Sequence, residues 1–232
     1  MSLSNEPDSS LEQQRAYVPG DRLRALAAGA ELAGRTSGSA LFADISGFTA
    51  LTGRFARELG LRRGAEELAR HLDRVWHELI ARVLSLAGSV ISFSGDAITC
   101  WFEGDDSQRA VTCAFALQEA MQPFRSGELG LSLKVAVARG PVRRFVVGEP
   151  QVQLLDVIAG ATLDRLALAE SLAQAGEVVV DSAAAESLAG RLTTGEGRSS
   201  ADLQFAVAVQ LHDPAPLQPQ AELPELPDLR SW

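Results

Sequence analysis

The sequence is poor in cysteine and histidine, and it has no long apolar run. Its only two cysteines, Cys100 and Cys113, lie in apolar surroundings, so we expect reduced core residues and no disulfide framework. Its three histidines lack the spacing of metal ligands. No apolar stretch approaches the roughly 18–20 residues that span a membrane, and the N-terminal MSLSNEPDSS has no signal-peptide core. We therefore expect a soluble, cytoplasmic chain with no membrane partner.

Clustered positive charge is also missing. The chain has 21 lysines and arginines against 30 aspartates and glutamates, which gives a net charge of −9. The arginine pairs at 62–63 and 143–144 are too short to form a basic patch. Because phosphate backbones are bound by clustered Lys and Arg, this balance argues against a nucleic-acid partner.

Enough apolar residues remain for one substantial core, since 46% of the 232 residues are hydrophobic. Residues 1–36 are expected to form an N-terminal arm with a helix that leads into the domain. Residues 37–212 are expected to form the domain itself. Residues 213–232 are proline-rich and are expected to be a linker. No internal repeat is evident.

Hydrophobic periodicity predicts strands and helices in a mixed order. A strand is expected at 39–45, helices at 47–60 and 64–88, and a hairpin at 89–102 that turns at Ser94-Gly95-Asp96. A helix is expected at 107–121. A second hairpin is expected over 131–148, with Gly140-Pro141 as its turn. A helix at 160–175, a strand at 177–181, a short helix at 182–190 and a strand at 203–211 complete the order. Hairpins mixed with crossover helices predict an α+β fold in place of a doubly wound parallel sheet.

Two aspartates are candidate metal ligands, one at the end of the first predicted strand and one at the tip of the first predicted hairpin. Asp44 follows four apolar residues of the first strand, where an ionised carboxylate needs hydrogen bonds, a cation or a metal. Asp96 lies in the tip of the first hairpin. If the hairpin flanks the first strand, both carboxylates meet at one edge of the sheet. Two such oxygen ligands with a backbone carbonyl suit Mg²⁺ or Mn²⁺.

The segment Ser46-Gly47-Phe48-Thr49 opens the next helix beside these carboxylates, and free N–H groups there bind phosphate oxygens. Simpler explanations exist, because an isolated Asp44 is often a helix N-cap and an isolated Asp96 a turn residue. An aspartyl-phosphate phosphatase is a poor match, because Ser46 occupies the place where a second aspartate would be expected.

Four stretches carry a family resemblance over roughly residues 37–212. They are FADISGFTAL, SFSGDAITCWF about fifty residues later, VAVARGPVRRFVVGE, and DVIAGATLDRLALAESLAQAGEVVVD. In sequence and spacing they resemble the class III adenylyl/guanylyl cyclases. The resemblance implies a ferredoxin-like α+β domain with an antiparallel sheet, which works as a dimer of cyclase domains with the active site between them.

In that family two aspartates bind the metals, and Asp44 and Asp96 match them, with the carbonyl of Ile45 as a further ligand. The implied reaction is attack of the ribose 3′-oxygen on the α-phosphate of a nucleoside triphosphate, which releases pyrophosphate. One metal lowers the pKa of the attacking hydroxyl, and the other neutralises the leaving phosphates. ATP is the substrate that we expect, with cAMP as the product.

The rest of the family's site is replaced. Ser92 stands at the position of the purine-selecting lysine, Asp164 at that of the ribose-orienting asparagine, and Leu168 at that of the arginine that stabilises the transition state. Arg165 lies about 60° around the helix from that arginine position and is a poor substitute. At the second purine contact Val157 falls on the matching position without a gap, with Asp156 beside it.

The metal pair is thus kept while the base-selecting and transition-state residues are lost together. This division is typical of the metal-bearing first domain of a tandem soluble-type cyclase, whose partner domain supplies the lysine, asparagine and arginine. The main hypothesis is therefore a half-site that needs a second cyclase domain in the same or another chain. A catalytically inactive module with a regulatory or dimerisation role is the alternative, and an active homodimer is a third.

Overall fold

The computed structural model describes residues 18–126, 130–149 and 153–218. Its strands are β1 (Arg35–Ser46), β2 (Ser89–Ser94), β3 (Ala97–Glu103), β4 (Ser132–Glu149), β5 (Gln153–Ala159), β6 (Val178–Asp181), β7 (Leu192–Ser200) and β8 (Leu203–Leu211). Its helices are α2 (Gly20–Ala27), α3 (Phe48–Leu59), α4 (Leu61–Ser85), α5 (Gln108–Ala120), α6 (Gln122–Ser126), α7 (Ala161–Leu172) and α8 (Ser182–Ser187).

One eight-stranded sheet organises the chain, in the order β2-β3-β1-β4-β6-β8-β7, with β5 paired to β4 outside this path. Neighbouring strands are antiparallel except for β4 and β6, which are parallel. The predicted α+β class is confirmed. The sheet is mixed, because the crossover through β5 and α7 returns the chain parallel to β4.

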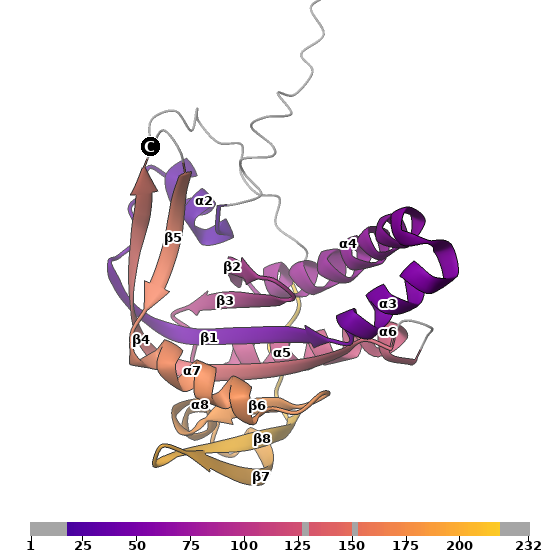
Figure 1. Cartoon of the computed structure of the whole chain (residues 1–232). Helices are drawn as coiled ribbons and strands as arrows, with labels where there is room; N and C mark the ends of the chain where they lie inside the picture. Colours follow the sequence, from indigo (N-terminus) through magenta and orange to yellow (C-terminus); the bar gives the residue numbers. More distant parts are fainter. Residues whose placement is uncertain (1–17, 127–129, 150–152, 219–232) are drawn as a thin grey trace, which may run out of the picture.

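Helices cover both faces of the sheet (Figure 1). On one face α3, α4, α5 and α8 pack against odd-numbered β1 residues such as Leu41 and Ile45. The predicted α4 stripe ends in Val75, Leu79 and Val83, which are fully buried. On the other face α7 packs Leu166 and Ala169 into a second cluster around Trp101 of β3. Even-numbered β1 residues such as Asp44 therefore point toward the α7 face.

The hairpin predicted over 131–148 is wrong, because β4 runs straight through Gly140-Pro141. Its ladder with β1 continues unbroken across this point, where Ser37 pairs with Pro141 and Gly38 with Gly140. Proline is tolerated here because the other edge of β4 is unpaired between the β6 and β5 ladders, which end at Val137 and begin at Arg143. Gly140 adopts a φ of 156°, and a Cβ there would lie 2.7 Å from Thr162 Oγ1 of α7.

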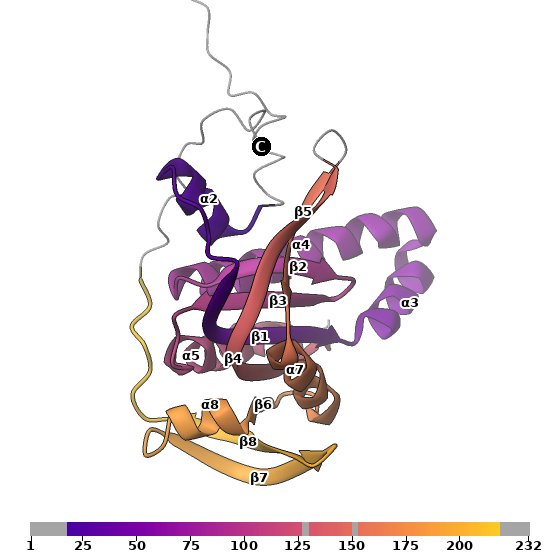
Figure 2. The same cartoon turned by 90° about the vertical axis from the view of Figure 1, so that its left-hand side faces the viewer.

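Two strands escaped the sequence analysis, namely β5 and β7. β5 pairs with the second half of β4 to form a long two-stranded arm that projects beside α2, as Figures 1 and 2 show. β7 is rich in glycine, serine and threonine and is largely exposed, so it lacks the apolar alternation that marks a strand. Alternation in β8 is realised only partly, because Leu203 and Val209 are exposed.

The expected domain boundaries of 37 and 212 remain predictions, although the structure describes the chain around both. Helix α2 lies within the expected arm, and β1 begins at Arg35. After β8 the chain runs back over the helices, where the amide of Ala215 donates to Thr112 Oγ1 and that of Gln218 to Ser85 O. Residues 1–17 and 219–232 lie outside the described part of the chain.

The two cysteines lie in the core, as the sequence analysis expects. Cys100 and Cys113 are free and fully buried, and burial raises the pKa of both thiols. His71 stacks on Phe55 with ring centroids 5.6 Å apart, and His77 is exposed. Across the described residues no helix is both long and apolar enough to cross a membrane.

Candidate metal and nucleotide site

Asp44 and Asp96 lie side by side at one end of the central strands. Asp44 pairs in register with Ala97, the residue that follows Asp96, and the amide of Ile45 donates to Asp96 O across 3.0 Å. The tip of the β2–β3 hairpin is therefore bonded directly to the end of β1. The juxtaposition of the two carboxylates that the sequence predicts is present.

A third charged group, which the sequence analysis missed, completes this cluster. Lys134 is the only lysine of the sequence, and it lies opposite Asp44 on β4. Its Nζ lies 3.2 Å from Asp44 Oδ2 and 2.5 Å from Glu170 Oε1 of α7. Lys134 thus compensates the charge of Asp44. The available signal was the strand alternation itself, which puts position 134 on the face opposite its buried neighbours Leu133 and Val135.

The surroundings of Asp44 favour a cation. Burial raises the pKa of Asp44, the hydrogen bond and charge of Lys134 lower it, and the charges of Asp96 and Glu170 raise it further, so that the net shift is upward. The hydrogen bond to Glu170 raises the pKa of Lys134, and its contacts with Asp44 act in the same direction against burial. Three carboxylates against one ammonium leave a negative site, which attracts cations.

The predicted phosphate-binding segment forms the turn from β1 into α3. Ser46 ends the strand, and Gly47 adopts a φ of 106°, which favours glycine. A Cβ at Gly47 would also lie 2.8 Å from Gly130 O. Phe48 and Thr49 begin α3, whose first turn has no side-chain cap and no acidic residue. The first N–H groups of this helix are thus without a side-chain acceptor, as anion binding requires.

This donor set fits a divalent ion that arrives with a phosphate ligand. No three His, Cys, Asp or Glu side chains gather as a metal cage within the described residues. Mg²⁺ rarely uses such cages, because it keeps waters and takes one or two carboxylates together with substrate phosphates. Asp44, Asp96 and the Ile45 carbonyl, next to the uncapped start of α3, fit this mode of Mg²⁺ coordination.

The chain matches no known family profile. Among curated proteins it is 27% identical over 150 residues to mouse adenylate cyclase type 10, and 27% identical over 151 residues to the human protein. Each match covers 62% of this chain and 9% of the relative, so the chain spans only about a tenth of the length of these relatives.

Solved structures of nucleotide cyclases share the fold. The Pseudomonas aeruginosa adenylyl cyclase CyaB superposes with a TM-score of 0.65 at 20% identity, covering 76% of this chain and 95% of that one. The guanylyl cyclase Cya2 gives a TM-score of 0.66 at 20% identity, with coverage of 81% and 98%. The chain thus has the fold of the class III cyclase catalytic domains. A Catenaria anguillulae guanylate cyclase domain, solved with GTP, gives 0.65 at 20% identity, with coverage of 77% and 100%.

The three positions at which the sequence departs from the class III cyclase pattern lie on two elements. Ser92 is exposed on β2, the edge strand of the sheet. Asp164 is exposed in the first turn of α7. Leu168, one turn further on, is half-buried and packs against the cluster around Trp101. Leu168 thus has a packing role as well as an apolar side chain where the family has a cation.

Arg165 does not replace the missing arginine, because the fold already uses it. Its Nε donates to Asp181 Oδ2 across 2.8 Å, and its Nη2 donates to Arg139 O across 2.6 Å. Both contacts tie α7 to the sheet beneath it. The sequence analysis expected a poor substitute, and the geometry agrees with that expectation.

Asp156, the other candidate for a purine contact, is also engaged elsewhere. Its side chain is 2% exposed and accepts from Arg144 Nε at 2.8 Å and from Arg22 Nε at 2.7 Å. Arg144 in turn donates to Asp21 of α2. These four residues, which we call the arm network, join α2 to both strands of the arm. Val157 at the matching position therefore leaves the second purine contact without a polar side chain.

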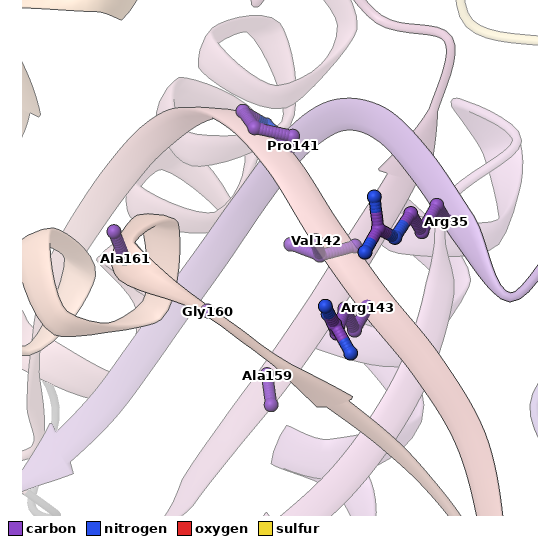
Figure 3. Close-up of a pocket in the computed structure, with 7 residues that line it drawn as sticks. All are labelled: Arg35, Pro141, Val142, Arg143, Ala159, Gly160 and Ala161. Carbon is purple, nitrogen blue, oxygen red and sulfur yellow. The ribbon is translucent and has the colours of Figure 1, made fainter.

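An open pocket of about 540 Å³ lies where the arm leaves the sheet, beside the start of α7 (Figure 3). Arg35 and Arg143 line it and are partners in the β1–β4 ladder. Arg35 lies nine residues before Asp44 on the same strand, which is about 30 Å at 3.3 Å per residue. Arg143 therefore cannot reach phosphates held at Asp44 of its own chain.

Proposed function

We propose that this domain is the metal- and triphosphate-binding half of a class III nucleotide cyclase site, and that a second cyclase domain completes it. The reaction is conversion of ATP to cAMP and pyrophosphate. The observation that carries the proposal is the placement of Asp44 and Asp96 side by side, next to the uncapped start of α3. The curated relatives are adenylate cyclases by name, which favours ATP over GTP.

In this proposal each group of the half-site has a distinct role. Asp44, Asp96 and the Ile45 carbonyl hold Mg²⁺ or Mn²⁺, and the N–H groups of the segment 46–49 hold the triphosphate oxygens. The bound metal supplies activation of the ribose 3′-hydroxyl and neutralisation of the leaving pyrophosphate. This chain orients the phosphates, while base selection and transition-state stabilisation come from the partner domain.

Two features support the need for a partner. Ser92 and Leu168 cannot donate as lysine and arginine do, and the neighbouring Arg165 is bound to Asp181. The arm in addition exposes apolar side chains on both of its strands, among them Phe145, Val147 and Leu155. A contiguous apolar surface of this kind is typical of a protein interface. Solved neighbours include a dimeric guanylyl cyclase domain from Blastocladiella emersonii.

Calorimetry with Mn²⁺ and a non-hydrolysable ATP analogue tests the proposal. We expect metal-dependent binding by the full chain, lost to background in Asp44→Asn and in Asp96→Asn, because each change removes a charged ligand. Asp202→Asn is the matched control. It removes the same charge in the exposed β7–β8 turn, where φ is 64° and asparagine is well tolerated, and it should bind like the wild type. Equal metal-dependent affinity in all four proteins would contradict the metal assignment.

A specific observation favours the second candidate, a catalytically inactive regulatory or dimerisation module. Lys134 already compensates Asp44, so the pair of aspartates is physically tolerable without a metal. Absence of metal-dependent nucleotide binding in the wild-type chain, together with a stable dimer by light scattering, would make this module the better assignment.

A further inference from the structure

The strongest unexplained feature of the domain is its single lysine, which bridges a predicted metal ligand and a carboxylate that has no assigned role. Lys134 lies between Asp44 on β1 and Glu170 on α7, at 3.2 Å and 2.5 Å. All three side chains are partly buried, with exposed fractions of 22–26%. The bridge thus sits within the domain rather than among loosely solvated surface charges.

We propose that Lys134 is a tethered cation that occupies Asp44 while the metal is absent and is held by Glu170 alone once the metal binds. This inference rests on the proposed metal-binding role of Asp44 and Asp96. The ammonium and a divalent ion cannot both sit against the same carboxylate oxygen without strong repulsion. Glu170 gives the displaced ammonium a second partner that is already in contact, so Lys134 need not leave the site.

The choice of lysine suits such an exchange. The chain has 21 cationic side chains, and every one except Lys134 is an arginine. An arginine fork binds a carboxylate through two fixed donors, whereas a lysine ammonium is a point charge on a flexible stem with three rotatable donors. Lysine can therefore share two carboxylates and give one of them up through a small movement of its side chain.

The consequence is a lower affinity of the site for a divalent ion that arrives without nucleotide. A divalent ion without nucleotide meets the positive charge of Lys134 at only a few ångströms, whereas a metal–triphosphate complex brings its own negative charge to the site. Lys134 thus lowers the affinity for the free ion more than the affinity for the ion that arrives with substrate. In the absence of metal it also keeps Asp44 paired.

Mn²⁺ titration of the full chain, without nucleotide, tests this by calorimetry. Lys134→Met keeps the length of the side chain and removes its charge, and we expect Mn²⁺ to bind at least about tenfold more tightly than to the wild type. Lys134→Arg keeps the charge and should bind Mn²⁺ within about threefold of the wild type. Thermal unfolding of each variant reports whether the fold is kept.

The role of Glu170 is tested by a double-mutant cycle. Glu170→Gln removes the second partner, so Lys134 should stay on Asp44 and Mn²⁺ should bind more weakly than to the wild type. In the Lys134→Met background the same change should have a clearly smaller effect, since no ammonium remains to be held. Equal effects of Glu170→Gln in both backgrounds would mean a simple charge effect and would overturn the exchange.

The wild-type protein gives a direct readout, because isotope-labelled lysine places one side-chain NMR signal in the whole chain. We expect this signal to shift on Mg²⁺ addition with the same saturation as metal binding, and to stay unchanged in Asp44→Asn. Mn²⁺ binding that is equal or weaker in Lys134→Met, with an unmoved lysine signal, would overturn the inference and leave the metal site standing. No metal binding by either protein, with or without nucleotide, would overturn the proposed function as well.

Discussion

Arg165 on α7 donates to Asp181 at the end of β6 across 2.8 Å, and this pair fixes the helix that carries two of the replaced family positions. Asp181 accepts in addition from the amides of Arg139 and Ala184, so its carboxylate is fully used inside the fold. Arg165, three residues before the position of the missing transition-state arginine, is therefore a structural residue. Its movement toward a substrate would leave Asp181, which is 1% exposed, without its cationic partner.

The first prediction is that the isolated chain makes little cyclic nucleotide from ATP or GTP, even with Mn²⁺. An arginine directed at a transferring phosphate contributes roughly 10³–10⁵ in rate, and neither half of a homodimer has one at position 168. Purified chain assayed for cAMP and cGMP checks this. Robust production with Asp164 and Leu168 unchanged would contradict the half-site, and would point to Arg143 of a partner as the cation.

The second prediction concerns the arm network. Arg144→Met leaves Asp156 and Asp21 without their main partner, and breaking a buried ion pair in this way costs about 3–5 kcal/mol. Urea unfolding measures the loss. Arg143→Met is the matched control, because this neighbour is exposed on the other face of the arm, and it should change the free energy of unfolding by less than about 0.5 kcal/mol. Similar losses in both variants would contradict the network's role.

The third prediction is an acid dependence of stability through Asp21. Burial alone would raise the pKa of Asp21, but the hydrogen bonds and charge of Arg144 outweigh burial and hold the pKa below its ordinary value of 3.8. The unfolded chain therefore binds protons at a higher pH than the folded chain. The stabilisation from Asp21 is complete above the ordinary pKa and is lost as the pH falls through the lower, folded value.

Urea unfolding at several pH values between about 5 and 2 checks this acid dependence. Asp21→Asn should be less stable than the wild type at pH 7 and should lose stability less steeply on acidification. Asp202→Asn serves again as the control for removal of an exposed carboxylate. Parallel curves for the wild type and Asp21→Asn would show that this carboxyl does not carry the effect.

Particular residues show how far the sequence could predict this domain. Apolar periodicity was enough for α3, α4 and α5, because their buried stripes repeat over several turns. The proximity of Asp44 and Asp96 could be predicted only on the condition that the hairpin flanks the first strand, and the β1–β3 ladder supplies that condition. The turn predicted at Gly140-Pro141 was wrong because a Gly-Pro pair indicates a turn only from its local sequence. In the fold, pairing with β1 keeps the strand extended through both residues.

The ion pairs of the fold were harder to predict from the sequence than its helices and strands. Lys134 and Glu170 are 36 residues apart in sequence, and the arm network joins Arg144 to Asp21 over 123 residues. No local pattern marks such pairs, because they depend on which helix crosses which strand. The position of Asp156 beside a family contact even suggested nucleotide recognition, and only the fold shows that its carboxylate is already paired.

The last prediction is that the missing half of the site can be restored. Position 168 lies one turn beyond Asp164 on α7, so side chains at both positions share a face of the helix. The triple change Ser92→Lys, Asp164→Asn and Leu168→Arg should supply the absent donors to Asp44 and Asp96 of a second chain. We expect a gain of about two orders of magnitude in cAMP formation with Mn²⁺, below the full arginine effect because the supporting residues are not tuned.

Leu168 is half-buried, so the variant must first be shown to be folded and dimeric, and we expect a loss of about 1–2 kcal/mol from the packing it gives up. Mixing two variants, each of which lacks one half of the site, then tests whether the new activity comes from a site shared between two chains. The triple variant with Asp44→Asn added lacks the metal pair but keeps the new donors, and the wild type has the reverse set. Each alone should be inactive, and their mixture should make cAMP at one site per heterodimer. A folded, mixed dimer that binds Mn²⁺ and nucleotide yet stays at background would favour the regulatory module, because every group that the half-site lacks would then be present without effect.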